Sequence, residues 1–145
     1  MTPKQYLWQI RTEKERIDDL VKARDELINT MQMVSSPSLE ERVQTSPRDR
    51  MPEYAARLDN FDREIQRRYD KYQKFVLTVC HQIDTMTGTT YDTEQSERHI
   101  LYMRYVMCAD WPVLVASIPY SKSRIYQLHG TALQTFAKQY PLIRL

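Results

Sequence analysis

An apolar or aromatic side chain recurs every seven residues through the middle of this 145-residue chain. The members of this repeat are Leu58, Ile65, Tyr72, Val79 and Met86. In an α-helix residues seven apart lie on one face, whereas a half-buried strand alternates every second residue. Phe61 and Phe75 follow members of the repeat by three positions, which widens the same face. The repeat therefore predicts a long amphipathic helix that opens at Pro52 and Glu53.

A second helix is predicted over the first 35 residues. It has two seven-residue series: Ile10, Ile17 and Met31, which Arg24 interrupts, and Leu20, Leu27 and Val34. Thr2 and Gln5 have the spacing of a capping box, and Pro3 suits the first helical position. The segment from Ser35 to Pro52 holds three prolines and four serines, so we expect a loop at about residues 35–51. The two helices can pair as an antiparallel, coiled-coil-like hairpin or between subunits, and the repeat itself leaves both arrangements open.

Composition supports an all-α protein. The chain has only two glycines, with 41% hydrophobic and 28% charged residues, which argues against a sheet with many tight turns. No apolar segment approaches the roughly 20 residues that a bilayer requires, and the first residues are charged, unlike a signal peptide. We therefore expect a cytoplasmic protein without a membrane partner. In that compartment Cys80 and Cys108 are expected to be reduced, buried thiols.

Charge divides the chain unevenly. Residues 98–145 contain six Lys and Arg against one acidic residue, whereas residues 1–97 contain fifteen against eighteen.

Gly88 is a plausible end for the long helix, and Asp92 and Gln95 have capping-box spacing for a third helix. We expect two domains, a helical hairpin or oligomerisation element at residues 1–88 and a basic domain at residues 92–145.

A proline breaks the apolar run in the basic part of the chain. Asp110 can cap a short helix, but Pro119 must end it, and Ser121 can cap the next helix. Numbered from Trp111, the apolar residues stand at the positions that pack the two helices of a helix-turn-helix together. These residues are Leu114, Ile118, Tyr120, Ile125 and Leu128. A small helix-turn-helix domain is therefore predicted after the hairpin.

The second helix of this motif divides into an inward and an outward side. The inward residues are Ile125, Leu128, Ala132, Leu133 and Phe136. The outward residues at its N-terminal end are the candidate DNA-binding residues, Ser121, Lys122, Ser123, Arg124, Tyr126 and Gln127. In the motif this end enters the major groove, where Lys and Arg meet phosphates and Gln can bind adenine through two hydrogen bonds. Gln127 can instead be a structural residue that braces the neighbouring helix.

The run from Glu97 to Phe136 resembles region four of bacterial primary-type sigma factors. The matching residues are Glu97-Arg98, Met103-Arg104-Tyr105, Ser121, Lys122, Arg124, Ile125, Gln127 and Ala132-Leu133. The departures from that pattern are Val115, Pro119, Tyr126 and His129, where the family usually carries a small residue, a glycine, an arginine and a glutamate. With the preceding helices, the whole chain also resembles small phage and prophage proteins related to late-gene transcriptional activators.

The resemblance implies a sequence-specific, double-stranded DNA-binding transcription regulator that acts with RNA polymerase or a host sigma factor. No segment resembles the part of a sigma factor that melts the promoter, so the chain is expected to assist a sigma factor or the polymerase. Two alternatives remain open: a DNA-packaging component like a small terminase subunit, and an adaptor that binds sigma factor or polymerase without DNA. The helical repeats also suggest a homo-oligomer.

Enzymatic and metal-binding functions find little support in the sequence. There is no phosphate-binding loop and no nucleophile elbow, and the carboxylates lie on charged helix faces. The cysteines and histidines lack the paired spacings of zinc sites, so we expect neither a metal nor a cofactor. We therefore expect a binding protein and not an enzyme.

Overall fold

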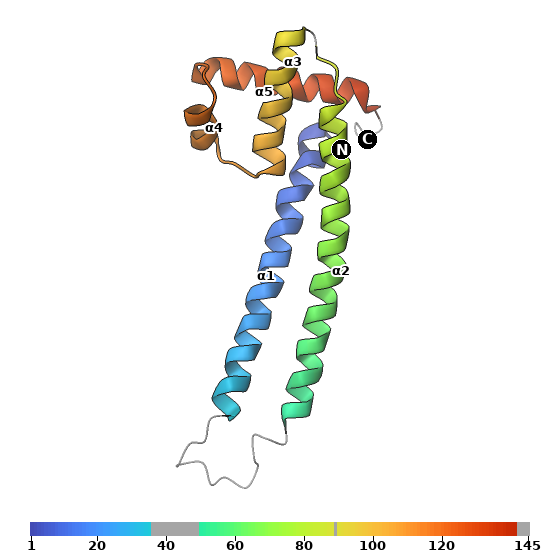
Figure 1. Cartoon of the computed structure of the whole chain (residues 1–145), viewed down its shortest axis with the longest axis vertical. Helices are drawn as coiled ribbons and strands as arrows, with labels where there is room; N and C mark the ends of the chain where they lie inside the picture. The colour runs from blue at the N-terminus through green and yellow to red at the C-terminus, as the bar shows by residue number, and fades with distance from the viewer. Residues whose placement is uncertain (36–49, 89, 142–145) are drawn as a thin grey trace. The chain divides into compact units, whose positions relative to one another are not determined.

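The computed structural model describes residues 1–35, 50–88 and 90–141 of the chain. Within these ranges all regular elements are helical, which confirms the predicted all-α class. The helices labelled in Figure 1 are α1 (Pro3–Ser35), α2 (Met51–Asp84), α3 (Tyr91–Leu101), α4 (Trp111–Ser117) and α5 (Lys122–Gln139). A π-helical turn, η2 (Tyr102–Val106), continues α3. The loop expected at about residues 35–51 lies almost wholly outside the described residues.

The first two helices begin close to where the sequence predicts. At the start of α1 the amide of Thr2 donates to Oε1 of Gln5 (2.9 Å), and the amide of Gln5 donates to the Thr2 hydroxyl (3.2 Å). These two bonds confirm the predicted capping box. α2 begins at Met51, one residue before the predicted Pro52.

Gly88 does not end α2, contrary to the prediction. α2 ends at Asp84, and Gly88 lacks the positive φ of a helix-ending glycine. A Cβ atom on Gly88 would come within 2.8 Å of the Cα atom of Glu94. The glycine is therefore required because the chain passes very close to the first turns of α3.

A different pair of residues from the predicted one caps α3. Thr90 has the extended conformation of an N-cap, with φ −137° and ψ 158°, and its hydroxyl accepts a hydrogen bond from the amide of Thr93 (3.3 Å). The Thr93 hydroxyl accepts in turn from the amide of Thr90 (3.2 Å). The prediction of a capping box at Asp92 and Gln95 is wrong, because α3 begins at Tyr91 and both residues already lie inside the helix.

The chain divides into two compact units. Unit 1 contains residues 1–13 and the described residues from Tyr72 onward, and unit 2 contains the described residues between Lys14 and Lys71. This division differs from the expected one at residues 88–92. The reason is that the first turns of α1 and the last turns of α2 share one buried cluster with the C-terminal helices.

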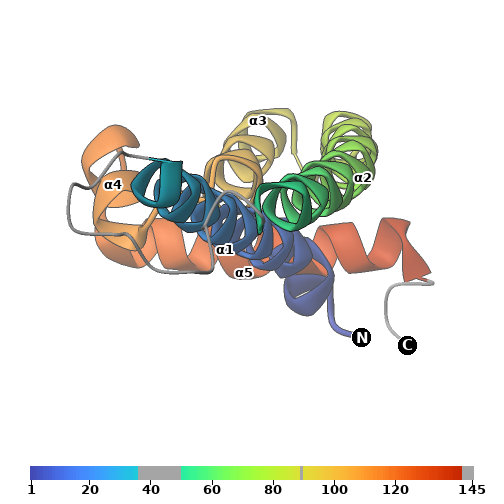
Figure 2. The ribbon, with the colours of Figure 1, turned by 90° about the horizontal axis from the view of Figure 1, so that it is seen from below.

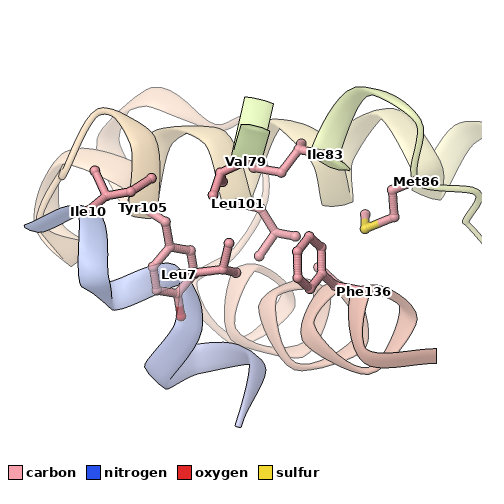
Figure 3. Packing of buried hydrophobic residues seen from close by; sticks show 9 residues of the cluster. Leu7, Ile10, Val79, Ile83, Met86, Leu101, Tyr105 and Phe136 are labelled. Carbon is pink, nitrogen blue, oxygen red and sulfur yellow. The ribbon is translucent and has the colours of Figure 1, made fainter. Parts of the chain in front are cut away.

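The main core of unit 1 joins four helices and η2 (Figure 3). Its buried members are Leu7, Ile10, Val79, Ile83, Met86, Leu101, Tyr105, Ala132 and Phe136. In Figures 1 and 2 α5 crosses the first turns of α1, and there the rings of Tyr6 and Phe136 lie 6.2 Å apart. Next to α5, the Tyr140 hydroxyl lies 2.7 Å from that of Thr85. These contacts hold the C-terminal helices against α1 and α2.

The helices in the described part of unit 2 are parts of α1 and α2. Ile17 is the only buried hydrophobic residue among its described residues, while Leu58 and Ile65 of the seven-residue repeat are half-buried. Arg24 of α1 forms an ion pair with Asp62 of α2. Two helices side by side therefore leave most of the apolar repeat in unit 2 partly accessible.

Candidate nucleic-acid interface

The chain breaks at Pro119 between α4 and α5, as the sequence predicts. α4 ends at Ser117, and Ile118 leaves the helical conformation with φ −101° and ψ 128°. The amide of Tyr120 donates to the carbonyl oxygen of Ile118 (2.8 Å), and α5 begins two residues later. The Ser121 hydroxyl accepts a hydrogen bond from the amide of Arg124 (3.2 Å), which confirms Ser121 as the cap of α5.

Asp110 stands at the N-cap position of α4, but its side chain makes no capping hydrogen bond. Its carboxylate instead pairs with Arg11 (3.3 Å) and lies 3.9 Å from a guanidinium nitrogen of Arg104. The prediction that this side chain caps α4 is wrong, because two guanidinium groups from other parts of unit 1 attract it.

The inward sides of α4 and α5 meet in a second buried cluster. Its buried members are Ile100, Leu114, Ile118, Ile125 and Leu128. Four of the five predicted packing positions are therefore buried, but Tyr120 is 46% exposed, and the prediction for it is wrong. Its hydroxyl extends to that of Ser96 on α3, at 3.4 Å. Further along α5, Ala132 and Phe136 are buried and Leu133 is partly buried in the main core, as expected.

The candidate residues at the start of α5 all lie on the surface. They are Ser121, Lys122, Ser123, Arg124, Tyr126 and Gln127. Within the described part of the chain, neither Lys122 nor Arg124 forms an ion pair. The structure thus places the two predicted cations together on one accessible helix end.

Within the described part of residues 98–145, the exposed positive charge lies on α5. Arg98 pairs with Glu94 and donates from Nε to the carbonyl oxygen of Met86 (2.9 Å), so it serves the fold. Arg104 donates to the carbonyl oxygen of Ala109 (2.9 Å). The other cations among the described residues from position 98 onward are Lys122, Arg124 and Lys138, which are all exposed, and α5 contains no acidic residue. This helix therefore presents a net positive surface to solvent.

Tyr126 is exposed, but its ring is not free on both faces. It lies 4.7 Å from the Trp111 ring of α4, measured between centroids, and 41% of the residue remains accessible. These two rings, Val115 and Lys122 line part of a groove of about 410 Å³ between α4 and the start of α5. Packing against Trp111 thus directs Tyr126 toward the α4 side of α5.

A cluster of aromatic and cationic side chains on the inward side of α5, in which Tyr105 and His129 are buried, was not predicted. His129 of α5 lies 4.8 Å from the Trp111 ring, and the Tyr105 hydroxyl lies 2.8 Å from Nε2 of His129. The guanidinium carbon of Arg104 lies 5.0 Å from the ring centroids of both Trp8 and Trp111. The spacing of His129 offered one signal, because it lies four residues after Ile125 on the inward side of the helix. The cluster braces α4 and α5 against α1.

The environment of this cluster determines its protonation. Burial, followed by the nearby charges of Lys4 and Arg104, lowers the pKa of His129 to about 4. Burial also raises the pKa of Tyr105 to about 12. At neutral pH the imidazole is therefore uncharged and the phenol keeps its proton. We assign Tyr105 as the donor and Nε2 of His129 as the acceptor.

Glu97 of α3 is fully buried, although it is an acidic residue. Thr135 lies beside it but donates its hydroxyl to the carbonyl oxygen of Thr131 (3.0 Å), and neither carboxyl oxygen has a hydrogen-bond partner within the described residues. Burial raises the pKa of this carboxyl group above its ordinary value. The Glu-Arg pair that opens the sigma-like run thus consists of a buried acid and an arginine bound to Glu94.

Cysteine and histidine side chains do not form a metal site in the described residues. No three side chains of the metal-ligating types His, Cys, Asp and Glu gather there. Cys80 and Cys108 are both free thiols, but both are half-buried, so the prediction that they are buried is wrong. Cys108 adopts a left-handed φ of 55° after η2, and its carbonyl oxygen accepts a hydrogen bond from Arg11 (2.6 Å).

Among the described residues, no helix combines the length and apolar character needed to span a bilayer.

Comparisons with known proteins identify no relative. No protein-family model matches the chain, no curated protein matches its sequence, and no solved structure matches its fold. The functional argument therefore depends on the residues and on their geometry.

Proposed function

We propose that the protein is a DNA-binding transcription regulator in which α4 and α5 form a helix-turn-helix with α5 as the recognition helix. One observation carries the proposal. α5 has an accessible N-terminal end with two cations that have no ion-pair partner among the described residues, while its opposite side is buried against α4 and the main core. A helix held in this way can enter the major groove without losing its packing.

Each outward residue has a proposed role in this arrangement. Lys122 and Arg124 lie in the first turn of α5, where long cationic side chains reach phosphates on either side of the groove. The helix dipole and the unpaired amides of the first turn add to this attraction. Ser123 and Gln127 face base edges, and Gln127 binds adenine. The exposed part of Tyr126 reaches base edges from the α4 side of α5, where its ring packs on Trp111. Ser121 acts mainly as the cap, since its hydroxyl already accepts from the Arg124 amide.

The resemblance of residues 97–136 to region four of sigma factors supports RNA polymerase or a host sigma factor as the protein partner. The resemblance of the whole chain to small phage and prophage proteins supports a role in late-gene transcription in the cytoplasm. We infer that α1 and α2 form a helical hairpin that supplies dimerisation or a polymerase contact.

The half-buried repeat of unit 2 supports self-association. Leu58, Phe61 and Ile65 are only partly covered, and Tyr69 is 45% exposed. A second copy packed on this face would complete the burial that two helices leave unfinished. Light scattering of the full chain tests this point, with a mass above one chain expected.

Selection of bound duplexes from random DNA tests the proposed function directly. The wild-type chain should enrich one sequence, and its affinity should fall steeply as salt rises, because Lys and Arg release counterions from phosphates. Lys122→Ala or Arg124→Ala should flatten the slope of log affinity against log salt by up to about one unit. Lys74→Ala, the same loss of charge on the exposed surface of α2, is the matched control and should leave the slope unchanged.

Gln127→Ala separates base recognition from phosphate binding. It should cost about 1 to 3 kcal/mol on the selected duplex, leave the salt slope unchanged and relax selection at one base pair. A Gln127→Ala protein that loses folding stability but keeps its site preference would instead assign Gln127 a structural role.

Other outcomes favour the alternative functions. Absence of salt-dependent DNA binding, together with capture of polymerase or sigma factor, would favour an adaptor. DNA binding by a ring-sized oligomer would favour a terminase-like packaging component.

A further inference from the structure

A row of residues follows one face of α5 beyond its N-terminal end. Ser123, Gln127, Gly130 and Gln134 stand at positions i, i+4, i+7 and i+11, so they lie along one line of the helix. The serine and both glutamines are exposed, and Gly130 is partly accessible. The row therefore continues the face that the proposed function assigns to base edges.

Gly130 is the unexpected member of this row. Glycine in the interior of a helix is less stable than alanine, because it loses more backbone freedom on folding. Two reasons commonly justify such a glycine, namely a positive φ and a close packing contact. Gly130 has neither among the described residues, since its φ is not positive and a Cβ atom there would meet no atom within 4 Å beyond its own chain neighbours and the adjacent helix backbone.

The contrast with Gly88 shows what a structural glycine looks like in this chain. A Cβ atom on Gly88 would lie only 2.8 Å from the Cα atom of Glu94, so the fold itself excludes a side chain there. The residues that the structure describes place no such restriction on residue 130. Any requirement for glycine at that position must therefore come from something outside the described residues.

The charge pattern around Gly130 indicates what approaches it. No residue of the row is charged, and the side chains of Ser123, Gln127 and Gln134 can form hydrogen bonds. The cations of α5 lie outside the row, with Lys122 and Arg124 in the first turn of the helix and Lys138 near its C-terminal end. A helix in the major groove has this distribution, because its central face meets base edges while its flanking cations meet phosphates.

We propose that Gly130 is the point of closest approach between α5 and the DNA duplex, and that base contacts extend past it to Gln134. The bare Cα of Gly130 lets the helix axis lie deep in the groove, with Gln127 and Gln134 on either side of the contact. This inference rests on the proposed function, since it requires α5 to be the recognition helix.

The full-length Gly130→Ala variant tests the inference through two effects of opposite sign. The variant should be more stable, with a rise of about 2 to 4 °C in its unfolding midpoint, because alanine favours the helix and meets no clash. Its affinity for the duplex selected with wild-type protein should nevertheless fall by about tenfold or more, because the methyl group holds the helix away from the bases. The salt slope should not change, since no phosphate contact is lost.

Thr78→Ala is the matched control. Thr78 is exposed on α2 and donates its hydroxyl to the carbonyl oxygen of Lys74 (2.9 Å), so its replacement also improves helix propensity without affecting α5. It should raise the unfolding midpoint and leave DNA affinity within about twofold of wild type.

Each contrary outcome has a distinct meaning. A stabilised Gly130→Ala protein with wild-type affinity would overturn the close approach at Gly130 and leave the proposed function standing. A destabilised Gly130→Ala protein would show that the fold requires the glycine, which also overturns the inference. A wild-type chain that selects no duplex would overturn the proposed function, and this inference with it.

Discussion

Ile65 and Ile83 belong to the same helix, α2, and both continue its apolar pattern, yet their surroundings differ. Ile83 lies in unit 1 and is 1% exposed, whereas Ile65 lies in unit 2 and is half-buried. In unit 1, α1 and α2 pack with α5 and with the α3–η2 segment, whereas the described residues of unit 2 belong to α1, α2 and the residue before α2. The periodicity of a helix thus shows which face is apolar, but the number of neighbouring elements determines how completely that face is buried.

Substitution of the two isoleucines should give the largest effect. Ile83→Ala should lower the free energy of unfolding by about 2 to 5 kcal/mol, because it leaves a cavity in a closed core. Ile65→Ala should cost about 1 to 2 kcal/mol, because less apolar area is lost at a half-buried site. Urea unfolding of both variants, followed by far-UV circular dichroism, measures the difference.

A concentration series makes this comparison sharper. If Ile65→Ala costs as much as Ile83→Ala, and the cost grows with protein concentration, another copy of the chain covers the repeat in unit 2. An equal cost that does not depend on concentration would contradict the difference in burial between the two units.

Acid should destabilise unit 1 through His129. Its pKa of about 4 lies below the ordinary value of 6.5, so between these values the unfolded chain binds a proton that the folded chain does not. The contribution of His129 to stability is therefore complete above about pH 6.5 and is lost as the pH falls toward 4, by up to about 3 kcal/mol. Urea unfolding at pH 7, 6, 5 and 4 measures this loss.

The His129→Gln variant tests the origin of the acid effect. Glutamine keeps an acceptor for the Tyr105 hydroxyl but cannot take up the proton, so the dependence on pH should become shallower. His81→Gln, at an exposed position on α2, is the control and should keep the wild-type dependence. Trp8 and Trp111 both lie in unit 1, so their fluorescence reports on this unit, and an acid-induced change confined to circular dichroism would contradict the prediction.

The smallest expected effect concerns the ion pair of unit 2. Arg24 and Asp62 are partly exposed, with 32% and 49% of their side chains accessible, so the pair should contribute only about 0.2 to 1 kcal/mol. A double-mutant cycle of Arg24→Ala and Asp62→Ala measures this coupling, which should weaken as salt rises. A coupling above about 2 kcal/mol that resists salt would show that unit 2 is better shielded from water than its side chains indicate.

Local features of the fold could be predicted well from the sequence. The capping box at Thr2 and Gln5, the break at Pro119 and the cap at Ser121 each depend on residues within a few positions of one another. The inward and outward sides of α5 also follow from helical spacing alone. The candidate DNA-binding residues were found in this way, and all of them are exposed.

Long-range contacts decided the features that sequence reasoning missed. Asp110 has the residue type of a helix cap, but its carboxylate accepts a hydrogen bond from Arg11, 99 positions earlier in the chain, and does not cap α4. Tyr120 fits the apolar pattern, but its hydroxyl reaches Ser96 and the residue stays exposed. No local pattern contains information about such partners.

The sequence by itself therefore determined the all-α class, the helix between Pro3 and Ser35, the turn before α5 and the accessible cations of that helix. Only the tertiary structure decided that the first turns of α1 and the last turns of α2 share a core with α5, and that the ring of Trp111 packs against Tyr126 and His129. It also showed that no contact within the described part of the chain requires Gly130 to be a glycine. The physical reason is the separation along the sequence over which each kind of interaction acts. Helix caps and periodicity depend on neighbours within about two turns, whereas burial depends on which distant elements pack around a residue.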